Sequence, residues 1–382
     1  MNKKLVIIPS DPIHEYEAKG TSSWLEEYFN PNSYFEEVYV LSPKENKERE
    51  VYGVKIIPIK SDKQYKKLLK KINPFCVRAY GGYWATDFAN YNRVGKIPVV
   101  SSIHDTNTDL IHESLKFSDA YFTMSKAVNN ILLDKLNIKS TNLLGNRVDT
   151  SKFIKETKYT KSNKFKSKRI VLHVGRKTYQ KNIENTIESL KYLPEDFILV
   201  LIGKGDIEPY LKIAVEYKVE NRVHFIEKVE NTELIKWYNL AKVLCVPSRW
   251  EGFGLVFAEA ASCKTKIVTS NIKPMNEYLI NDGVMNVLVE DFENPISISK
   301  AILKLVNNPN TNKKTREYIV ENFDKKVIAK REIEFYKSVI YKGKNKKLDY
   351  KKWYYKFLYR KDIMHTKNRI IKLPKRIWRK LS

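Results

Sequence analysis

Short apolar runs that alternate with helical stretches recur along this chain and most constrain its fold. The first series of runs comprises Leu5–Ile8, Val38–Leu41, Lys55–Ile59, Phe75–Arg78, Val99–Ile103, Tyr121–Met124 and Thr141–Leu144. Amphipathic stretches such as Tyr65–Ile72 and Lys126–Leu136 lie between them. Continuous apolar strands that alternate with helices are typical of a parallel sheet covered on both faces. The pattern therefore predicts an α/β fold.

A polar, lysine-rich stretch, Lys155–Arg169, interrupts this rhythm, and we interpret it as an interdomain linker. The second series then comprises Ile170–Val174, Phe197–Ile202, Val223–Ile226, Val243–Val246, Ile267–Thr269 and Val287–Val289. Two doubly wound, Rossmann-like domains are predicted. Such sheets bind ligands outside the carboxyl ends of their strands, so we expect the active site in the cleft between the domains.

The expected domain boundaries follow from these two series. They place a first domain at 1–154, a linker at 155–169, a second domain at 170–322, and terminal helices at 323–382 that cross back to the first domain and end in a basic amphipathic tail.

Composition limits the cellular setting that we expect. None of the apolar runs approaches the ~18–20 residues that span a bilayer, and the short run Leu5–Ile8 favours a first strand over a signal peptide. The chain has only three cysteines, Cys76, Cys245 and Cys263. Because they are few and odd in number, we predict reduced residues of a cytosolic protein.

The chemistry is concentrated in residues 247–261, where an apolar strand ends at Pro247 and an alanine-rich helix begins near Leu255. A turn that opens a helix presents free backbone N–H groups and the positive end of the helix dipole, which suits a phosphate. Two carboxylates, Glu251 and Glu259, flank this turn eight positions apart. Acids beside a phosphate site need another role, such as accepting hydrogen bonds from sugar hydroxyls. The combination suggests a nucleotide-sugar site.

Two further elements follow strand ends in the second series. Gly175 is followed by Arg176 and then by Lys181, two cations that can clamp a diphosphate. Gly203-Lys204-Gly205 forms a second glycine turn, which is a weak signal by itself.

These elements, in this order and spacing, resemble the retaining GT-B glycosyltransferases of the large Glu-x7-Glu family, glycosyltransferase group 1 or family 4. The resemblance is strongest from about Ile170 to Val306. It implies that Glu251 contacts the donor sugar and stabilises charge at the reacting centre, and that Glu259 binds the ribose hydroxyls. Arg176 and Lys181 would neutralise the diphosphate. Donor-facing backbone is implied at Gly203, Gly252, Phe253, Gly254 and Leu255.

The first domain matches the family less closely. Only Gly20 remains of the family's glycine-rich loop after the first strand, and it is expected to approach the diphosphate. His104 follows Val99–Ile103 and matches the family's histidine at that strand end, which implies a catalytic position over the donor sugar.

The resemblance also implies the reaction. A UDP-, GDP- or ADP-sugar would donate a hexose-type sugar, with retention, to a glycan or lipid-linked acceptor in cell-surface polysaccharide biosynthesis, such as that of lipopolysaccharide. We expect no cofactor and no metal, because the sequence shows no Asp-x-Asp and no ligand cluster, and cationic side chains can replace a metal. Several departures, such as Lys264-Thr265-Lys266 in place of Gly-x-Pro, leave a catalytically inactive scaffold as an alternative.

Charge is concentrated at the C-terminal end of the sequence. The formal net charge is +26, and residues 341–382 contain sixteen Lys or Arg against two acids. An apolar stripe that includes Trp353, Tyr354 and Phe357 accompanies these cations. We predict that residues 342–382 bind an anionic membrane surface, which would place the protein at the inner face of the cell membrane. Packing on the first domain is the other interpretation of this tail. Nucleic-acid binding is an alternative that leaves Glu251 and Glu259 unexplained.

Overall fold

The computed structural model describes residues 3–18, 24–139, 141–160, 162, 165–227 and 229–342. Its described residues form two compact units. The first contains the chain up to Thr123, Val128–Leu143 and the chain from Lys330 onward, and the second contains Met124–Ala127 and Leu144–Ala329. This division assigns residues 144–154 to the second unit, whereas the sequence pattern places them in the first domain.

The first unit is built on a sheet with the strand order β3-β4-β2-β1-β5-β6-β7-β8. Its strands are β1 (Lys4–Ile8), β2 (Glu37–Ser42), β3 (Arg49–Val51), β4 (Val54–Pro58), β5 (Cys76–Tyr80), β6 (Val99–Ile103), β7 (Ala120–Thr123) and β8 (Asn142–Leu143). All neighbours pair in parallel except β3, which pairs antiparallel with β4 at the sheet edge.

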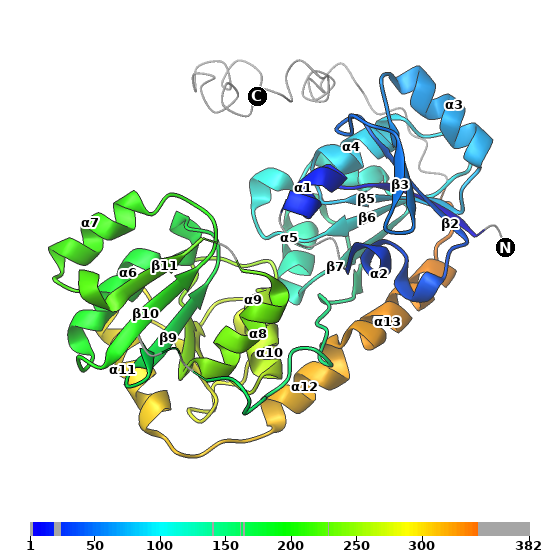
Figure 1. Ribbon diagram of the computed structural model, residues 1–382. Coiled ribbons are helices and arrows are strands. Elements are labelled where there is room, and N and C mark those ends of the chain that lie inside the picture. Colours follow the sequence, from blue (N-terminus) through cyan, green and yellow to red (C-terminus); the bar gives the residue numbers. More distant parts are fainter. Residues whose placement is uncertain are drawn as a thin grey trace. The chain divides into compact units, whose positions relative to one another are not determined.

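Helices α1 (Ile13–Ala18), α2 (Leu25–Phe29), α3 (Asp62–Ile72), α4 (Trp84–Tyr91) and α5 (Lys126–Leu136) connect these strands (Figure 1). Helix α3 shows why the sequence is helical here. Ser61 caps its first turn by accepting a hydrogen bond from the Gln64 backbone N–H, and the buried side chains of Tyr65, Leu69 and Ile72 lie on one face. That face packs into the core between the sheet and α4.

The second unit has a sheet of six parallel strands in the order β11-β10-β9-β12-β13-β14. These strands are β9 (Arg169–Val174), β10 (Phe197–Ile202), β11 (Val223–Ile226), β12 (Val243–Val246), β13 (Lys266–Ser270) and β14 (Asn286–Val289). The helices of this unit include α6 (Ile183–Ser189), α7 (Glu208–Glu216), α8 (Asn231–Leu240), α9 (Leu255–Ser262), α10 (Met275–Tyr278), α11 (Pro295–Asn307) and α12 (Lys314–Phe323).

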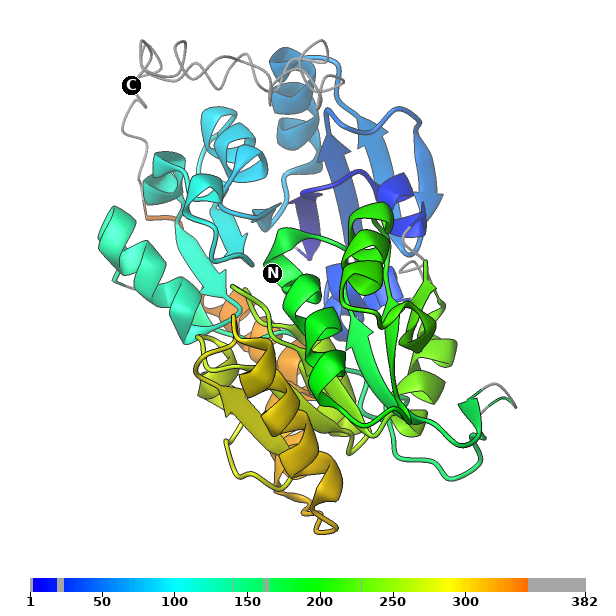
Figure 2. The same ribbon diagram turned by 90° about the vertical axis from the view of Figure 1, so that its left-hand side faces the viewer.

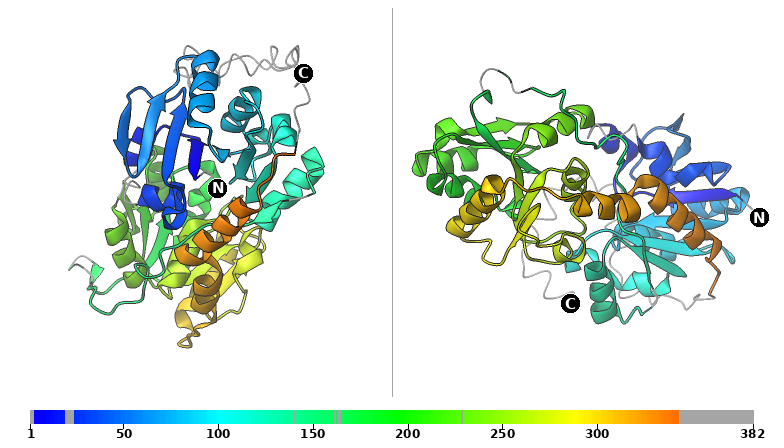
Figure 3. Two further views of the ribbon diagram at one scale, coloured as in Figure 1. Left: turned by 90° about the vertical axis from the view of Figure 1, so that its right-hand side faces the viewer. Right: turned by 90° about the horizontal axis from the view of Figure 1, so that it is seen from below.

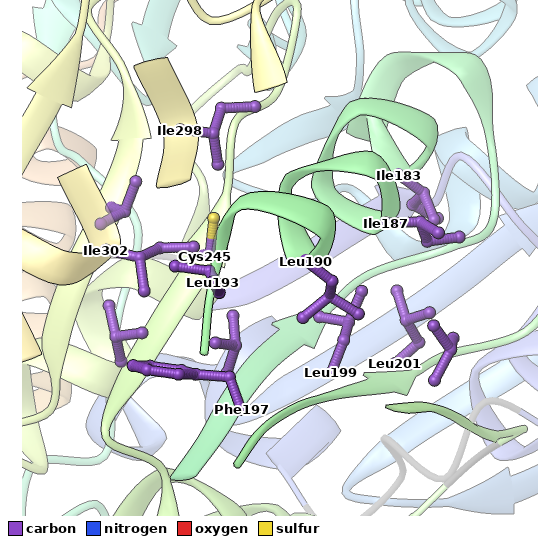
Figure 4. Close-up of a cluster of buried hydrophobic side chains, with 14 of the residues drawn as sticks. Ile183, Ile187, Leu190, Leu193, Phe197, Leu199, Leu201, Cys245, Ile298 and Ile302 are labelled. Atoms are coloured by element: carbon purple, nitrogen blue, oxygen red, sulfur yellow. The ribbon is translucent and has the colours of Figure 1, made fainter. Parts of the chain in front are cut away.

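The core of the second unit lies between one face of this sheet and helices α6, α7 and α11 (Figure 4). Figure 4 shows Ile183, Ile187, Phe197, Leu199 and Ile302 pointing into this layer. Helices α6 and α7 lie in front of the strands in Figure 2, and α8 and α9 occupy the opposite face of the sheet in Figure 1. Burying apolar side chains on both faces fixes the strand ends that carry the site.

Helix α13 (Lys325–Lys337) follows α12 and ends the regular structure of the described chain (Figure 3). Its first residues, up to Ala329, belong to the second unit, and the residues from Lys330 belong to the first. The expected helical segments after Lys313 are therefore confirmed as far as Lys337. The basic tail lies outside the described residues, apart from Lys342.

Most predicted strands match the structure. Val99–Ile103, Phe197–Ile202, Val223–Ile226 and Val243–Val246 agree residue for residue, and the other predicted strands differ by one or two residues at their ends. Strand β3 was not predicted. It has three residues, none of them buried, so it carries no apolar run.

Candidate active site

The predicted donor-binding residues of the second unit all lie at one edge of its sheet or in the helix that begins there. Strands β10, β9 and β12 are adjacent and parallel, so their carboxyl ends lie side by side. The segments after them carry Gly203, then Arg176 with Lys181, and finally Glu251 with the residues up to Leu255. The topology therefore brings together residues that are up to about 80 positions apart in sequence.

Glu251 pairs with Lys181. The Lys181 Nζ donates a hydrogen bond to Glu251 Oε1, and the Ser248 hydroxyl donates to the same oxygen over 2.8 Å. The two charged side chains are only 12% and 8% exposed. A buried charge needs a partner, and Lys181 and Glu251 each provide one for the other.

Arg176 differs from Lys181 in its surroundings. Its side chain is exposed, and within the described part of the chain it makes no hydrogen bond or ion pair. The buried neighbour Lys177 instead donates to the carbonyl oxygen of Gly203. Arg176 therefore offers a guanidinium fork at this edge that an anion such as a diphosphate can occupy.

Gly203 permits a close approach between two strand ends. A Cβ at this position would lie 1.9 Å from the carbonyl oxygen of Gly175, and Gly203 has a φ of +148°. The aliphatic part of Lys181 packs over Gly175, where an added Cβ would lie 3.1 Å from the Lys181 Cε. These glycines therefore allow the two strand ends and the Lys181 side chain to lie close together.

Helix α9 begins directly after Gly254, whose φ of +78° lies in the left-handed region. No side chain caps this helix, so its first N–H groups point toward the edge of the sheet without a side-chain acceptor. The Tyr278 hydroxyl donates to the carbonyl oxygens of Phe253 and Gly254 over 2.8 and 3.0 Å, and the Phe253 ring stacks on Tyr278. These contacts fix the turn that includes Gly252 and leads into Leu255.

Glu259 lies on α9 and is buried. One of its oxygens accepts a hydrogen bond of 2.8 Å from the Tyr238 hydroxyl of α8. Burial raises the pKa of this carboxyl to about 7, and the Tyr238 hydrogen bond opposes that shift. A carboxyl group in this state gains from further hydrogen-bond donors, which the hydroxyls of a ribose would provide.

The other two predicted site residues belong to the first unit. His104 follows β6 and is half-buried, with its Nε2 3.0 Å from the Ser102 hydroxyl. Its ring stacks on Tyr80 at a centroid distance of 6.0 Å and an interplanar angle of 14°. Gly20 lies outside the described residues. The structure therefore brings together the predicted donor-binding residues of the second unit. It describes the surroundings of His104 within the first unit alone.

Sequence reasoning missed several residues that support the site. Ser248 was within the motif but received no role, and nothing in the sequence connects Tyr238 with Glu259, 21 positions away. His173 on β9 is fully buried below the site. Burial and the nearby Lys181 and Lys177 lower its pKa to about 3, so it is neutral at physiological pH. The signal for such residues is spatial, because they lie on neighbouring elements of the fold.

The described residues contain neither a cluster of metal-ligating side chains nor a helix suited to cross a membrane. No group of three or more His, Cys, Asp or Glu side chains in the described ranges is placed to hold a metal ion. Among the helices that the structure describes, none combines the length and the apolar character that a membrane crossing requires.

Comparison with solved structures defines the class of fold. The chain superposes on Anabaena Alr3699/HepE in complex with UDP-glucose with a TM-score of 0.70 and 14% identity, over 88% of this chain and 99% of that chain. Sucrose-phosphate synthase from Thermosynechococcus elongatus gives a TM-score of 0.68 with 17% identity, over 87% of this chain and 98% of that chain. The fold is GT-B, with two Rossmann-like units, as predicted.

Sequence comparisons identify the family. The model for "Glycosyl transferases group 1" matches residues 154–324. The chain is 28% identical to the uncharacterized glycosyltransferase MJ1607 of Methanocaldococcus jannaschii, over 65% of this chain and 69% of the relative. It is 30% identical to the O-antigen chain mannosyltransferase RfbU of Salmonella typhimurium, over 51% of this chain and 54% of the relative. The chain belongs to the group 1 glycosyltransferases, which use nucleotide-sugar donors.

Proposed function

We propose that this glycosyltransferase transfers a hexosyl unit, with retention of configuration, from a nucleoside diphosphate sugar to a glycan or lipid-linked acceptor. The observation that carries the proposal is the Lys181–Glu251 pair at the carboxyl ends of β9 and β12, with Arg176 and the start of α9 beside it. Cations and helix N–H groups suit a diphosphate, and the carboxylates of Glu251 and Glu259 suit hydroxyl groups.

In this proposal, donor binding separates Lys181 from Glu251, because each side chain then binds a different group of the donor. The diphosphate takes hydrogen bonds from Arg176 and Lys181, and the Glu251 carboxylate accepts from the hydroxyls of the donor sugar. Ser248 keeps Glu251 oriented while this exchange takes place. Glu259 accepts from the ribose hydroxyls. The pair is thus a preformed site in which each charge is satisfied before the donor arrives.

In the reaction, the bond between the anomeric carbon and the diphosphate oxygen breaks while the acceptor oxygen bonds to the same face of that carbon. Negative charge develops on the departing diphosphate, where Arg176, Lys181 and the N–H groups of α9 meet it. The departing phosphate oxygen takes the proton of the acceptor hydroxyl. His104 helps to position that acceptor. We infer that no metal is needed, because the cations supply the compensating charge, and full activity in EDTA tests this point.

Calorimetry with a panel of UDP-, GDP- and ADP-linked hexoses tests the proposal, together with release of nucleoside diphosphate as a measure of turnover. The wild-type protein is expected to bind at least one donor and to release its nucleotide. Glu251→Gln and Lys181→Ala should each lower turnover by roughly 10²–10³. Binding without any turnover would indicate an inactive scaffold. No binding of any donor would contradict the proposed function.

The acceptor belongs to cell-surface polysaccharide biosynthesis in this proposal. Support comes from the similarity to an O-antigen chain mannosyltransferase and from the basic, aromatic sequence of residues 342–382, which favours an anionic membrane surface. A lipid-linked acceptor would be presented at such a surface. The protein would then act on the inner face of the membrane.

A further inference from the structure

Two exposed aromatic side chains belong to the two segments that carry Lys181 and Glu251. Tyr179 comes two positions before Lys181 and Trp250 comes directly before Glu251. Their side chains are 66% and 39% exposed, and their ring centroids are 6.1 Å apart at an interplanar angle of 49°. Among the described residues, no other two exposed large apolar side chains form a ring contact with each other. A pair of exposed aromatic rings in contact is a candidate surface for a ligand.

The two segments that carry these rings are tied together by their backbones. The Arg249 backbone N–H donates to the carbonyl oxygen of Gln180 over 2.8 Å, and the Gln180 side-chain amide donates to the carbonyl oxygen of Trp250 over the same distance. These hydrogen bonds therefore fix the positions of the two segments relative to each other. Lys181 follows Tyr179 by two positions and Glu251 directly follows Trp250, so the same two segments carry the rings and the ion pair.

The Arg249 guanidinium packs against one face of the Tyr179 ring. Its guanidinium carbon lies 3.8 Å from the centre of the Tyr179 ring and so covers one face of that ring. Glu293 binds the same guanidinium through two hydrogen bonds of 2.7 Å, and Glu184 lies 2.8 Å from it. A side chain held by so many groups is fixed in place, and this fixes the orientation of the Tyr179 ring.

The charged groups that contact Arg249 beside this aromatic pair disfavour an anionic ligand. The single positive charge of Arg249 is opposed by the two carboxylates of Glu184 and Glu293. A diphosphate or a nucleic-acid backbone would meet a net negative charge here, whereas Arg176 and Lys181 offer one cation each a few residues away. The aromatic pair therefore suits a neutral ligand.

The rings also retain polar groups for a ligand. Within the part of the chain that the structure describes, neither the Tyr179 hydroxyl nor the Trp250 Nε1 makes a hydrogen bond. A pyranose ring matches this surface, because its C–H face is apolar and packs on an aromatic ring while its hydroxyls project from the ring edge toward polar groups. Tyrosine and tryptophan combine an apolar body with a polar tip in this way.

We propose that Tyr179 and Trp250 form a stacking surface for a pyranose unit of the acceptor glycan. The inference rests on the proposed function, since it names the acceptor of that reaction as a carbohydrate. The buried Lys181–Glu251 pair holds the donor through charge and hydroxyl contacts, and the exposed rings hold the neutral glycan that arrives from solution. Tyr179 and Trp250 thus act as acceptor-binding residues rather than donor-binding residues.

The test compares Tyr179→Ala, Trp250→Ala and the conservative Trp250→Phe with Tyr192→Ala, which removes another exposed tyrosine of the same unit. Saturation-transfer NMR measures direct binding of methyl α- and β-pyranosides of glucose, galactose, mannose and N-acetylglucosamine. Transfer to the p-nitrophenyl glycoside of the best of these sugars gives KM and kcat, and hydrolysis of the donor by water is measured alongside.

Each alanine variant at Tyr179 or Trp250 is expected to raise the acceptor KM about tenfold, with kcat and donor hydrolysis within twofold of wild type. Trp250→Phe should restore most of the affinity, and Tyr192→Ala should behave as wild type. The inference is overturned if no pyranoside binds the wild-type protein, if the KM is unchanged, or if the variants weaken donor binding instead. Normal donor binding by the wild type in those cases leaves the glycosyltransferase function intact, whereas failure of the wild type to bind any nucleotide-sugar donor contradicts that function.

Discussion

Arg78 and Glu332 form an ion pair in the interior of the first unit, although they are 254 positions apart along the chain. Their side chains are 1% and 0% exposed. Arg78 also donates to the Tyr336 hydroxyl over 3.1 Å, and its guanidinium lies over the rings of Tyr80 and Phe122 at 4.1 and 4.6 Å. Helix α13 is thereby fixed to strand β5.

Loss of Glu332 should therefore destabilise the first unit. Glu332→Ala leaves the Arg78 charge buried without its counter-ion, which costs about 3–5 kcal/mol in the free energy of unfolding. Glu334→Ala is the matched control, because it breaks an exposed ion pair with Lys337 on the same helix and should leave the free energy of unfolding nearly unchanged. Hydrogen exchange of β5 and α13 measures both changes, and equal losses in the two variants would contradict the prediction.

The pH dependence of stability should change when Glu259 is replaced. Its folded-state pKa of about 7 lies above the ordinary value of 4.5. The folded protein therefore holds a proton that the unfolded chain releases, and stability falls as the pH rises from about 4.5 to 7. Above pH 7 the cost approaches about 3 kcal/mol. Glu259→Gln removes this titration and keeps an acceptor for Tyr238. Scanning calorimetry should find the variant more stable than wild type at pH 8 and similar at pH 5.

The same carboxyl group should make donor binding depend on pH. The ionised form of Glu259 is the better acceptor for ribose hydroxyls, and it is the minor form at pH 6 because the pKa is about 7. Wild-type donor affinity is expected to rise several-fold, and at most about tenfold, between pH 6 and pH 8. Calorimetric titrations at both values measure this change. Glu259→Gln should bind the donor weakly at either pH, and a wild-type affinity that does not change with pH would contradict the assigned role.

Arg176 should contribute to donor affinity without contributing to stability. Its exposed guanidinium has no partner in the described chain, so Arg176→Ala removes no native contact. We expect a fall in donor affinity of about tenfold or more, as for other charge-assisted hydrogen bonds, and an unchanged melting temperature. Lys242→Ala serves as the control, since Lys242 is exposed at the opposite end of the sheet, before β12. An equal loss of affinity in both variants would indicate only a general effect of charge.

Gly203→Ala should damage the site more than an alanine at another glycine of positive φ. The new methyl group would lie 1.9 Å from the Gly175 carbonyl oxygen, so the ends of β9 and β10 must separate. We expect loss of donor binding in calorimetry. Gly95 provides the comparison, because its φ of +55° is also positive but its Cβ would meet no atom within 4 Å. Gly95→Ala should cost about 1 kcal/mol of stability and leave binding intact.

Residues 342–382 should bind anionic membranes. Sedimentation with vesicles of anionic phospholipid in low salt is expected to recover the full chain, and deletion of these residues should abolish the binding. High salt should release the protein, because the attraction is electrostatic in part. Failure of the full chain to sediment in low salt would reject the membrane assignment and leave the catalytic proposal unaffected.

Much of the fold could be predicted because buried parallel strands appear as apolar runs, as at Phe197–Ile202 and Val243–Val246. The site could be predicted only as a set of residue types near strand ends. The Lys181–Glu251 pair joins residues 70 positions apart, and the partner of Glu259 is a tyrosine on another helix. Such partners depend on which strands are neighbours, and no periodicity in the sequence records that order.

Helix α13 also bears on how the protein is made. The interior of the first unit contains a guanidinium whose counter-ion is at position 332, so residues 3–143 alone leave that positive charge without compensation. During synthesis on the ribosome, the N-terminal strands emerge long before Glu332 does. The first unit therefore completes its packing only after the second has been translated, which makes the nascent N-terminal half a natural client for chaperones and a poor choice for expression as a separate fragment.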